Sequence, residues 1–211
     1  AAIRPAEPTD ATMMQRFVDR LSPESRRHRF FSQSPPSVDL IAVLCDSSKP
    51  LSQFTLIVTR IWEGTSRIIA AGSYWAKNEH TAEVAMAVDD EFHGKGLGTL
   101  LLERLALVAI RHGFTNLWAV THADNLAMRE VFRESGFTAY ETYEGEDMEV
   151  ELSLIPTEMT VSRAELRERL ATTASLRPFF YPRSVAVIGA SRDPKSIGYR
   201  LLEALTTNHF R

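Results

Sequence analysis

The sequence predicts an α+β protein built on a twisted, mixed and mostly antiparallel sheet of six to seven strands flanked by helices. Two observations support this prediction. Runs rich in β-branched and apolar residues follow one another at 53–61, 67–77 and 81–88 with only short turns between them, as in hairpin-linked strands. Over 97–154 the apolar residues then switch between helical and strand-like spacing, which indicates strands separated by helices.

The N-terminal part favours a short strand followed by helices. A strand at 2–4 precedes a helix at about 10–21. A second helix begins after Ser22, because a serine followed by proline is a typical helix start. The basic residues 26–29 fall in the last turns of that helix, where positive charge complements the helix dipole. A third helix is expected at about 38–45.

The three central strands come next, and Gly72 marks a possible bulge in the second of them. In the third strand, Val84, Met86 and Val88 alternate with Glu83, Ala85 and Ala87, so the two sets lie on opposite faces. A glycine-rich turn then opens an amphipathic helix. The remaining elements are expected at 97–112 (helix), 116–121 (strand), 124–135 (helix), 137–143 (strand) and 148–154 (strand).

The composition is that of a soluble globular protein. The 211 residues are 44% hydrophobic and 24% charged, and the net charge of −3 gives no sign of a nucleic-acid partner. There is no apolar run of about 18 residues, so we expect no membrane span. Arg4 and Pro5 interrupt any apolar signal peptide, and Cys45 is the single cysteine. A cytoplasmic location, no disulfide framework and no metal are the resulting expectations.

The glycine-rich turn His93-Gly94-Lys95-Gly96-Leu97-Gly98 has the properties of a phosphate cradle. Backbone N–H groups at a helix start, together with the helix dipole, bind anions, and glycines allow the backbone to come close. Lys95 adds a cation, and Thr99 adds a hydroxyl and an N–H group. The turn lacks the Walker pattern, so it does not indicate a P-loop. A glycine-rich connector without a ligand is the alternative interpretation.

This turn resembles the signature of the GNAT superfamily of N-acetyltransferases, Gln/Arg-x-x-Gly-x-Gly/Ala. Gly96 and Gly98 match, whereas His93 stands at the Gln/Arg position. The resemblance implies that acetyl-CoA is the donor and that its pantetheine arm pairs with the preceding strand. It also implies a diphosphate held by the backbone amides of the turn. The residues implied in acetyl-CoA binding are Met86, Ala87, Val88, His93, Gly94, Lys95, Gly96, Leu97, Gly98 and Thr99.

A second block of this superfamily, Asn-x-x-Ala-x-x-x-Tyr-x-x-x-Gly-Phe, is similar to residues 125–137. Asn125 matches and by resemblance contacts the pantetheine arm, although a simple helix cap is an equally good interpretation. Phe132 replaces the tyrosine that protonates the departing thiolate in many relatives. Because a thiol has a pKa of about 8.5, the thiolate readily takes a proton from water or from the product ammonium. We therefore expect Phe132 to pack against pantetheine and no dedicated acid at this position.

Acetylation of a lysine requires a base, because reaching the neutral amine near pH 7 costs about 4.6 kcal/mol when the pKa is about 10.4. Glu83 is the first candidate, since it begins the strand expected to bind pantetheine, and strand glutamates occupy a similar place in related lysine acetyltransferases. A solvated strand-end charge is the alternative. His122 is the second choice, and the other candidates are His80, Asp89, Asp90 and Glu91, of which the last three resemble solvated loop acids.

The C-terminal part carries a second resemblance. Residues 177–198, which include Ser184-Val185-Ala186-Val187-Ile188-Gly189-Ala190-Ser191, resemble the start of the CoA-binding domain of NDP-forming acyl-CoA synthetases. We therefore expect an acetyltransferase domain at 1–155, a linker with a short helix at 156–182, and a truncated strand–helix unit of a Rossmann-like domain at 183–211.

A transferase joined to such a domain is similar to the bacterial Pat-type protein lysine acetyltransferases. The resemblance implies direct transfer from acetyl-CoA or propionyl-CoA to a lysine of an AMP-forming acyl-CoA synthetase. Three other functions stay open: acetylation of a small amine, a non-catalytic domain that senses acyl-CoA, and a structural scaffold domain whose turn binds no ligand.

Overall fold

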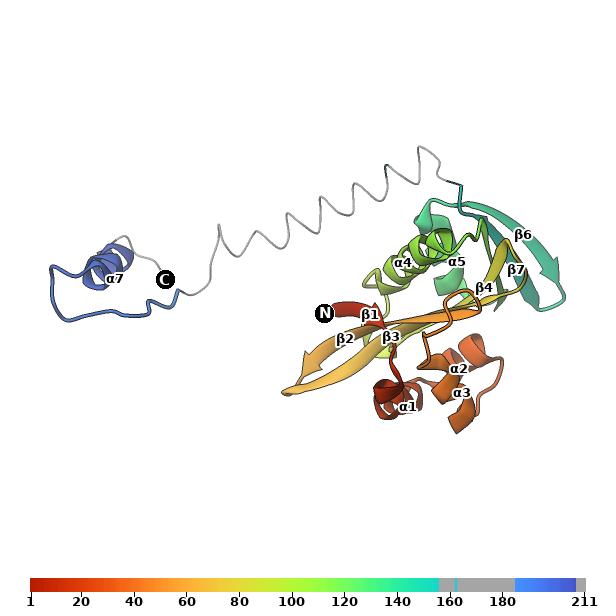
Figure 1. Cartoon of the computed structure of the whole chain (residues 1–211), viewed down its shortest axis with the longest axis horizontal. Helices are drawn as coiled ribbons and strands as arrows, with labels where there is room; N and C mark the ends of the chain where they lie inside the picture. Colours follow the sequence, from red (N-terminus) through yellow and green to blue (C-terminus); the bar gives the residue numbers. More distant parts are fainter. Residues whose placement is uncertain (156–161, 163–184, 208–211) are drawn as a thin grey trace. The chain divides into compact units, whose positions relative to one another are not determined.

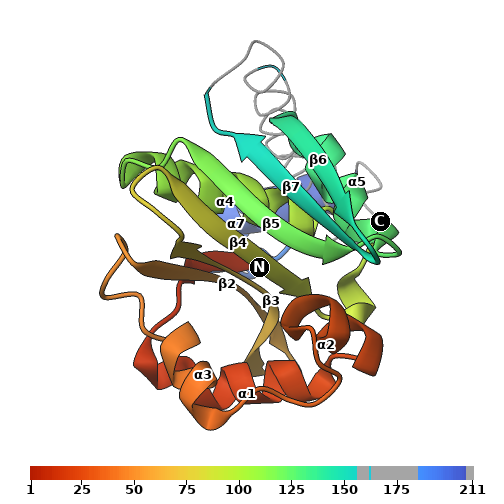
Figure 2. The same cartoon turned by 90° about the vertical axis from the view of Figure 1, so that its right-hand side faces the viewer.

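The computed structural model describes residues 1–155, Ser162 and residues 185–207. The chain divides into two units, residues 1–163 and 164–211, which are described separately. The first contains a mixed seven-stranded sheet in the order β1-β2-β3-β4-β5-β7-β6, with helices on both faces (Figures 1 and 2). The predicted α+β architecture is therefore confirmed. Among the described residues, no helix is both long enough and apolar enough to cross a membrane.

The elements follow the predicted order closely. The strands are β1 (Ala2–Pro5), β2 (Gln53–Trp62), β3 (Thr65–Ala76), β4 (Thr81–Val88), β5 (Asn116–His122), β6 (Thr138–Glu144) and β7 (Asp147–Ser153). The α-helices of the first unit are α1 (Ala11–Arg20), α2 (Pro23–Phe30), α3 (Val38–Leu44), α4 (Leu97–Arg111) and α5 (Leu126–Ser135). Short 3-10 helices occur at η1 (Pro8–Asp10) and η2 (Asp90–Phe92).

The sheet separates two apolar cores. On one face, α4 and α5 pack over a core that includes Tyr74, Val84 and Leu105, while α1 and α3 cover the other face through residues such as Phe17 and Ile41. The side chains of β4 alternate between these faces, as the sequence predicts. Both faces of the central strands are therefore covered, and the site must lie where the sheet itself opens.

The predicted position of the bulge was wrong. The irregular register of the β2–β3 ladder lies between Val58 and Thr59, not at Gly72. Gly72 is required for a different reason, because a Cβ atom there would lie 2.8 Å from Cδ1 of Leu105 and 2.9 Å from Cγ of Met86. Glycine at this position thus lets α4 pack closely on the sheet.

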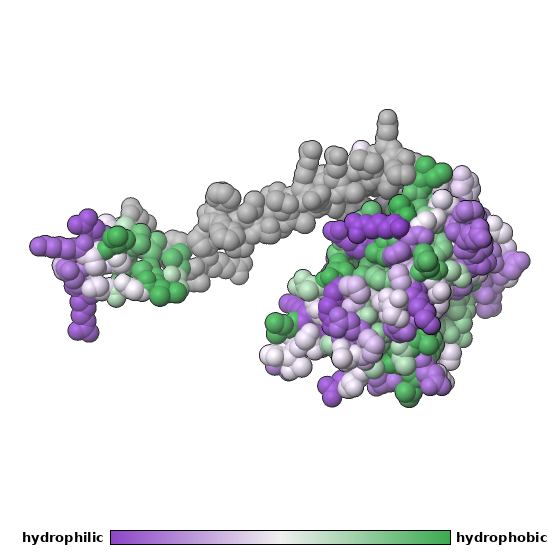
Figure 3. Space-filling model, viewed as in Figure 1, coloured by the Kyte–Doolittle hydropathy of each residue, from purple (hydrophilic) through white to green (hydrophobic). Residues whose placement is uncertain are grey.

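The second unit contains α7 (Ile197–Thr207), which confirms the predicted C-terminal helix. The strand expected at 184–188 is not formed by residues 185–188, since the neighbouring strands that would pair with it are absent from the described residues. Gly198 lies against the preceding turn, where a Cβ atom would be 2.5 Å from the Gly189 carbonyl oxygen. Figure 3 shows both hydrophobic and hydrophilic residues on the visible surface of this unit. The helix expected from Ser162 onward falls almost wholly outside the described residues.

Candidate active site

Strands β4 and β5 run in parallel but pair only at their beginnings. The register is Thr81 with Asn116, Ala82 with Leu117 and Glu83 with Trp118. Beyond Glu83, no further β4–β5 pairing is formed in the described part of the chain. The two strands separate there, and residues 84–86 of β4 and 119–121 of β5 line one cleft of about 380 Å³.

The backbone of β4 directs hydrogen-bonding groups toward this opening. The Asp89 N–H group donates to the Ile69 carbonyl at 2.9 Å, which identifies these two residues as a hydrogen-bonded antiparallel pair. Because such pairs alternate along a ladder, the N–H and C=O groups of Val84, Met86 and Val88 point away from β3 and toward the separation from β5. An extended chain of amides, such as pantetheine, is suited to such a strand edge.

A second cleft of about 570 Å³ lies beside the glycine-rich turn. His93, Gly94 and Gly96 line it together with the first residues of α4, and helix α5 supplies another wall through residues 125–131. The first N–H groups of α4 have no partner within the helix, and the positive end of its dipole is located there. These features fit a diphosphate, as the sequence predicts.

The glycines of the turn serve two different purposes. Gly94 and Gly96 have φ values of 67° and 73° with open space where a Cβ atom would be, so their backbone conformation requires glycine. Gly98 is helical, but a Cβ atom there would lie 2.9 Å from Cγ2 of Val131. Gly98 therefore permits close packing of α4 on α5, which the sequence-based interpretation attributed to phosphate approach.

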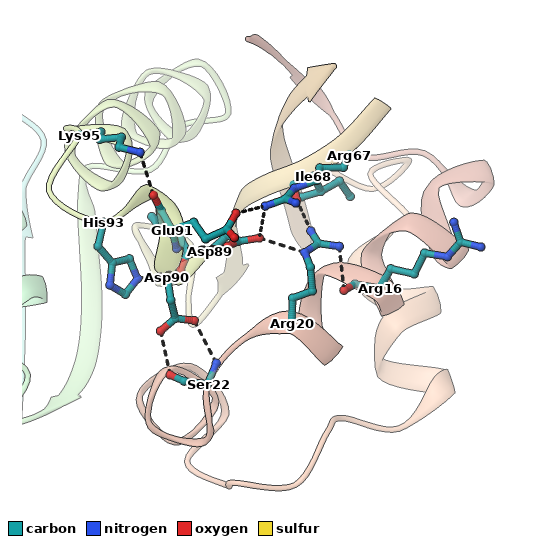
Figure 4. A network of polar contacts seen from close by, with 11 residues as sticks. Arg16, Arg20, Ser22, Arg67, Ile68, Asp89, Asp90, Glu91, His93 and Lys95 are labelled. Carbon is teal, nitrogen blue, oxygen red and sulfur yellow. Dashed lines mark hydrogen bonds and ion pairs between the residues drawn. The ribbon is translucent and has the colours of Figure 1, made fainter. Parts of the chain in front are cut away.

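Lys95 does not supply its cation to this cleft. Its Nζ atom donates to the Glu91 carbonyl at 2.8 Å and lies 4.6 Å from the centre of the Phe92 ring (Figure 4). Several acids line the cleft instead, namely Glu24, Asp90, Asp124, Glu130 and Glu134. Anion binding at this position must therefore depend on backbone N–H groups.

The acids that precede the turn have structural partners. Asp89 is buried and forms ion pairs with Arg20 at 3.0 Å and Arg67 at 3.4 Å, so the expectation of a solvated loop acid is wrong for this residue. Asp90 is exposed and accepts hydrogen bonds from Ser22 and other groups of α2 (Figure 4). Partial burial raises the pKa of Asp90, but these hydrogen bonds outweigh it and leave the pKa below its usual range. Both acids connect the end of β4 to the first helices.

Glu83 lies where β4 and β5 begin to separate. In the sheet register it is flanked by Trp75 on β3 and Trp118 on β5, and directly opposed residues share a face of the sheet. Its side chain is exposed and lines the first cleft, on the face covered by α1, α2 and α3. Glu83 therefore lines the first cleft, and its role as the base stays a prediction.

The histidines proposed as bases are less well placed. His122 lies behind Phe31, with ring centroids 4.8 Å apart, and its Nδ1 atom is 2.8 Å from a carboxylate oxygen of Asp147. His80 is exposed in the turn between β3 and β4. Neither residue lines the two clefts.

Asn125 and Phe132 both lie where the two strands separate. The Asn125 side chain accepts a hydrogen bond from the Met128 N–H group at 3.1 Å, so the residue is the helix cap of the alternative interpretation. Its amide also donates to the Thr121 hydroxyl at 3.0 Å. Phe132 is 1% exposed and forms part of the wall of the first cleft. Contact of either residue with pantetheine stays a prediction.

Sequence reasoning missed the contribution of α2 and the segment that follows it. Arg27 and His28 bind the Asp124 carboxylate at 2.6 and 3.3 Å, so α2 is held against the start of α5. Arg29 lines the first cleft, as do several residues of 30–36. In the sequence, the helix dipole alone accounts for the basic residues 26–29. The separate roles of Arg27, His28 and Arg29 become apparent only from the packing of α2 on β4.

Comparison with known proteins identifies the family. Residues 19–137 match the Acetyltransferase (GNAT) family. The chain is 33% identical over 138 residues to Acetyltransferase PA5475 of Pseudomonas aeruginosa, a match that covers 64% of this chain and 73% of the relative. It is 28% identical over 137 residues to Acetyltransferase Pat of Mycolicibacterium smegmatis, but covers only 40% of that protein and 64% of this chain.

Solved structures agree with this assignment. The GNAT domain of S. lividans PAT superposes with a TM-score of 0.64 at 25% identity, covering 72% of this chain and 89% of that domain. The acetyltransferase yncA of Salmonella typhimurium, solved with acetyl-CoA, shares the fold with a TM-score of 0.57 at 21% identity, covering 74% of this chain and 95% of that one. The chain therefore belongs to the GNAT family of acetyltransferases.

Proposed function

We propose that this chain is a protein lysine Nε-acetyltransferase that transfers the acetyl group directly from acetyl-CoA, within a ternary complex, to a lysine of an AMP-forming acyl-CoA synthetase. The observation that carries this proposal is the position of Glu83 at the separation of β4 and β5, beside a free strand edge. The similarity to the two Pat proteins supports the choice of a protein lysine as acceptor.

In this proposal the pantetheine arm lies along the edge formed by residues 86–88, next to Asn125 and Phe132. The main-chain groups of Met86 and the N–H group of Val88 bind it, because His93 contacts the Val88 carbonyl. Ala87 contributes only as part of the strand, because its backbone pairs with Ala71. The N–H groups of residues 95–99 bind the diphosphate. Acetyl-CoA supplies an activated acetyl thioester.

Glu83 takes a proton from the acceptor ammonium, either directly or through one water molecule. The neutral amine nitrogen then forms a bond to the acetyl carbon while the carbon–sulfur bond breaks. As the amide forms, the nitrogen loses its second proton to water, and the leaving thiolate, whose conjugate acid has a pKa of about 8.5, takes a proton from water. Phe132 contributes no proton, and its apolar ring excludes water beside the thioester.

The test measures acetylation of a defined acceptor protein by the wild type and by a Glu83 variant. Labelled acetyl-CoA is incubated with the protein and a purified AMP-forming acyl-CoA synthetase, and label on the synthetase lysine is measured. Glu83→Gln is expected to lower kcat roughly 100-fold or more while the KM for acetyl-CoA changes little. Glu79→Gln, an exposed substitution outside both clefts, serves as the matched control.

A kcat within a few-fold of wild type would remove Glu83 from the role of base. A small amine is the second candidate acceptor, because a cleft of about 380 Å³ accommodates a small molecule as well as a lysine side chain. Turnover of free amines without label on the synthetase would favour it. Tight binding of acetyl-CoA without any transfer would instead indicate an acyl-CoA-sensing domain.

A further inference from the structure

Arg29 is a cation inside the first cleft without a strong partner. It lies near the C-terminal end of α2, on the side that packs against β4. Its guanidinium carbon is 4.9 Å from the centre of the Phe30 ring and 5.6 Å from that of Trp75. Its single hydrogen bond within the described chain is a long one to the Ser73 hydroxyl, at 3.5 Å.

The surroundings of the Arg29 guanidinium favour the binding of an anion. Burial lowers the pKa of Arg29 to about 10, although the nearby Glu83 carboxylate acts to raise it, so the guanidinium stays charged at neutral pH. Among the described residues, no carboxylate forms an ion pair with Arg29. The guanidinium is partly buried, and the contact with Ser73 is its one hydrogen bond within the described chain, so its other N–H groups are available to an acceptor that enters the cleft.

The aromatic contacts also orient the group. Stacking between a guanidinium plane and aromatic rings covers its faces and leaves the N–H donors at its edge available. These donors match the two oxygens of a carboxylate, with which arginine forms paired hydrogen bonds. A second charge of opposite sign, Glu83, lines the same cleft. The cleft is therefore complementary to a molecule that carries both an amine and a carboxylate.

We propose that Arg29 binds a carboxylate of the acceptor and thereby selects acceptors with a carboxylate close to the reactive amine. This inference rests on the proposed function, because it places the acceptor amine beside Glu83. The carboxylate has two sources: an acidic side chain next to the acceptor lysine in a protein, or the α-carboxylate of a free amino acid. Both present the same chemistry to Arg29.

The experiment compares acceptors that differ only in this group. One arm uses lysine peptides with a flanking aspartate or asparagine, and the other uses free lysine and its carboxamide. Each acceptor is assayed by steady-state kinetics with wild-type protein, Arg29→Gln, Arg29→Lys and Arg16→Gln. Arg16 is exposed on α1 and lines neither cleft, so its substitution controls for the loss of one positive charge.

In the wild type, kcat/KM is expected to be roughly 10- to 100-fold higher for the carboxylate acceptor than for its amide partner. In Arg29→Gln the ratio of the two kcat/KM values should fall to near unity, mainly because the KM for the carboxylate acceptor rises. Arg29→Lys should retain part of the preference. Arg16→Gln should keep it in full. The arm in which the preference occurs identifies the source of the carboxylate.

Equal kcat/KM for the two members of both pairs in the wild type would overturn the inference while leaving acetyl transfer established. If Arg29→Gln kept the wild-type preference for the carboxylate acceptor, the inference would also be overturned, because another residue would then bind the carboxylate. If the wild type acetylates none of these acceptors and no synthetase, the proposed function fails, and the role of Arg29 fails with it.

Discussion

The imidazole Nε2 atom of His93 lies 2.9 Å from the carbonyl oxygen of Val88. This contact joins the first residue of the glycine-rich turn to the last residue of β4. The Val88 carbonyl points toward the separation of β4 and β5, so His93 closes the strand edge at the end nearest the turn. The histidine thus holds together the two parts of the proposed acetyl-CoA site.

Replacing His93 with alanine is expected to raise the Kd for acetyl-CoA about 3- to 10-fold, because one hydrogen bond between turn and strand is lost. His93→Gln should bind nearly as tightly as the wild type, since its amide is also a donor. Isothermal titration calorimetry with acetyl-CoA measures both values. His80→Ala changes an exposed histidine away from the site and is the control. If His93→Ala bound acetyl-CoA as tightly as the wild type, the contact between His93 and Val88 would not contribute to binding.

The contact between Gly98 and Val131 predicts a coupling between two helices. In the wild-type background, Gly98→Ala gains helix propensity of about 1 kcal/mol but places a Cβ atom 2.9 Å from Val131 Cγ2, which costs about 1–3 kcal/mol. In a Val131→Ala background the same substitution should stabilise the protein. Urea unfolding of the four proteins gives the coupling, which we expect to exceed about 1 kcal/mol. A coupling near zero would contradict the observed packing.

The ion pair between Arg4 and Asp10 predicts how the stability of the protein depends on pH. Asp10 is buried and bonded to Arg4 through both carboxylate oxygens, at 2.6 Å each. These bonds hold the pKa of Asp10 below its usual range, although burial acts against them. Because the pKa is lower in the folded state, the pair stabilises the protein above the unfolded pKa of about 3.9 and loses this effect as the pH falls through the folded value.

Asp10→Asn is therefore expected to lower the free energy of unfolding by about 1–3 kcal/mol at pH 7. The difference from the wild type should shrink as the pH falls below about 4. Urea titrations at a series of pH values measure this. Asp19→Asn, on the exposed side of α1, should have little effect at any pH. A difference that stays constant down to acidic pH would mean that the charge of Asp10 is not responsible.

Most of the fold could be predicted because its signals are local. Strand β4 was expected at the residues it occupies, and Ser22 caps α2 through the Ser25 N–H group as a serine–proline start suggests. The apolar run at 185–188 shows the limit of this reasoning. Its composition is that of a strand, but a strand requires pairing partners, which local sequence does not reveal.

The site was predictable in part for the same reason. The glycine spacing identified the turn, since Gly94 and Gly96 need a positive φ that is a property of the local chain. The positions of Lys95 and Arg29 depend on long-range or side-chain geometry. Lys95 bends back to η2, and Arg29 enters the cleft only because α2 packs on β4. The sequence shows that a residue is basic, but not which part of the structure its charged group contacts.

Phe132 provides a final prediction. Many relatives have tyrosine at this position as an acid, so Phe132→Tyr introduces the missing hydroxyl at a site that is 1% exposed in the wall of the first cleft. If protonation of the thiolate by water is sufficient, kcat should change by no more than about three-fold. The new hydroxyl should instead lower the free energy of unfolding by about 1–3 kcal/mol, because it is buried beside apolar residues.

Steady-state kinetics over a range of pH, together with urea unfolding, measures these two effects separately. Phe137→Tyr adds the same group at a partly buried position just beyond α5 and controls for the general effect of a hydroxyl. A rise in kcat of ten-fold or more in Phe132→Tyr alone would show that departure of the thiolate limits the wild-type reaction. In that case proton transfer to sulfur, rather than from the acceptor amine to Glu83, would be the step that this active site performs least well.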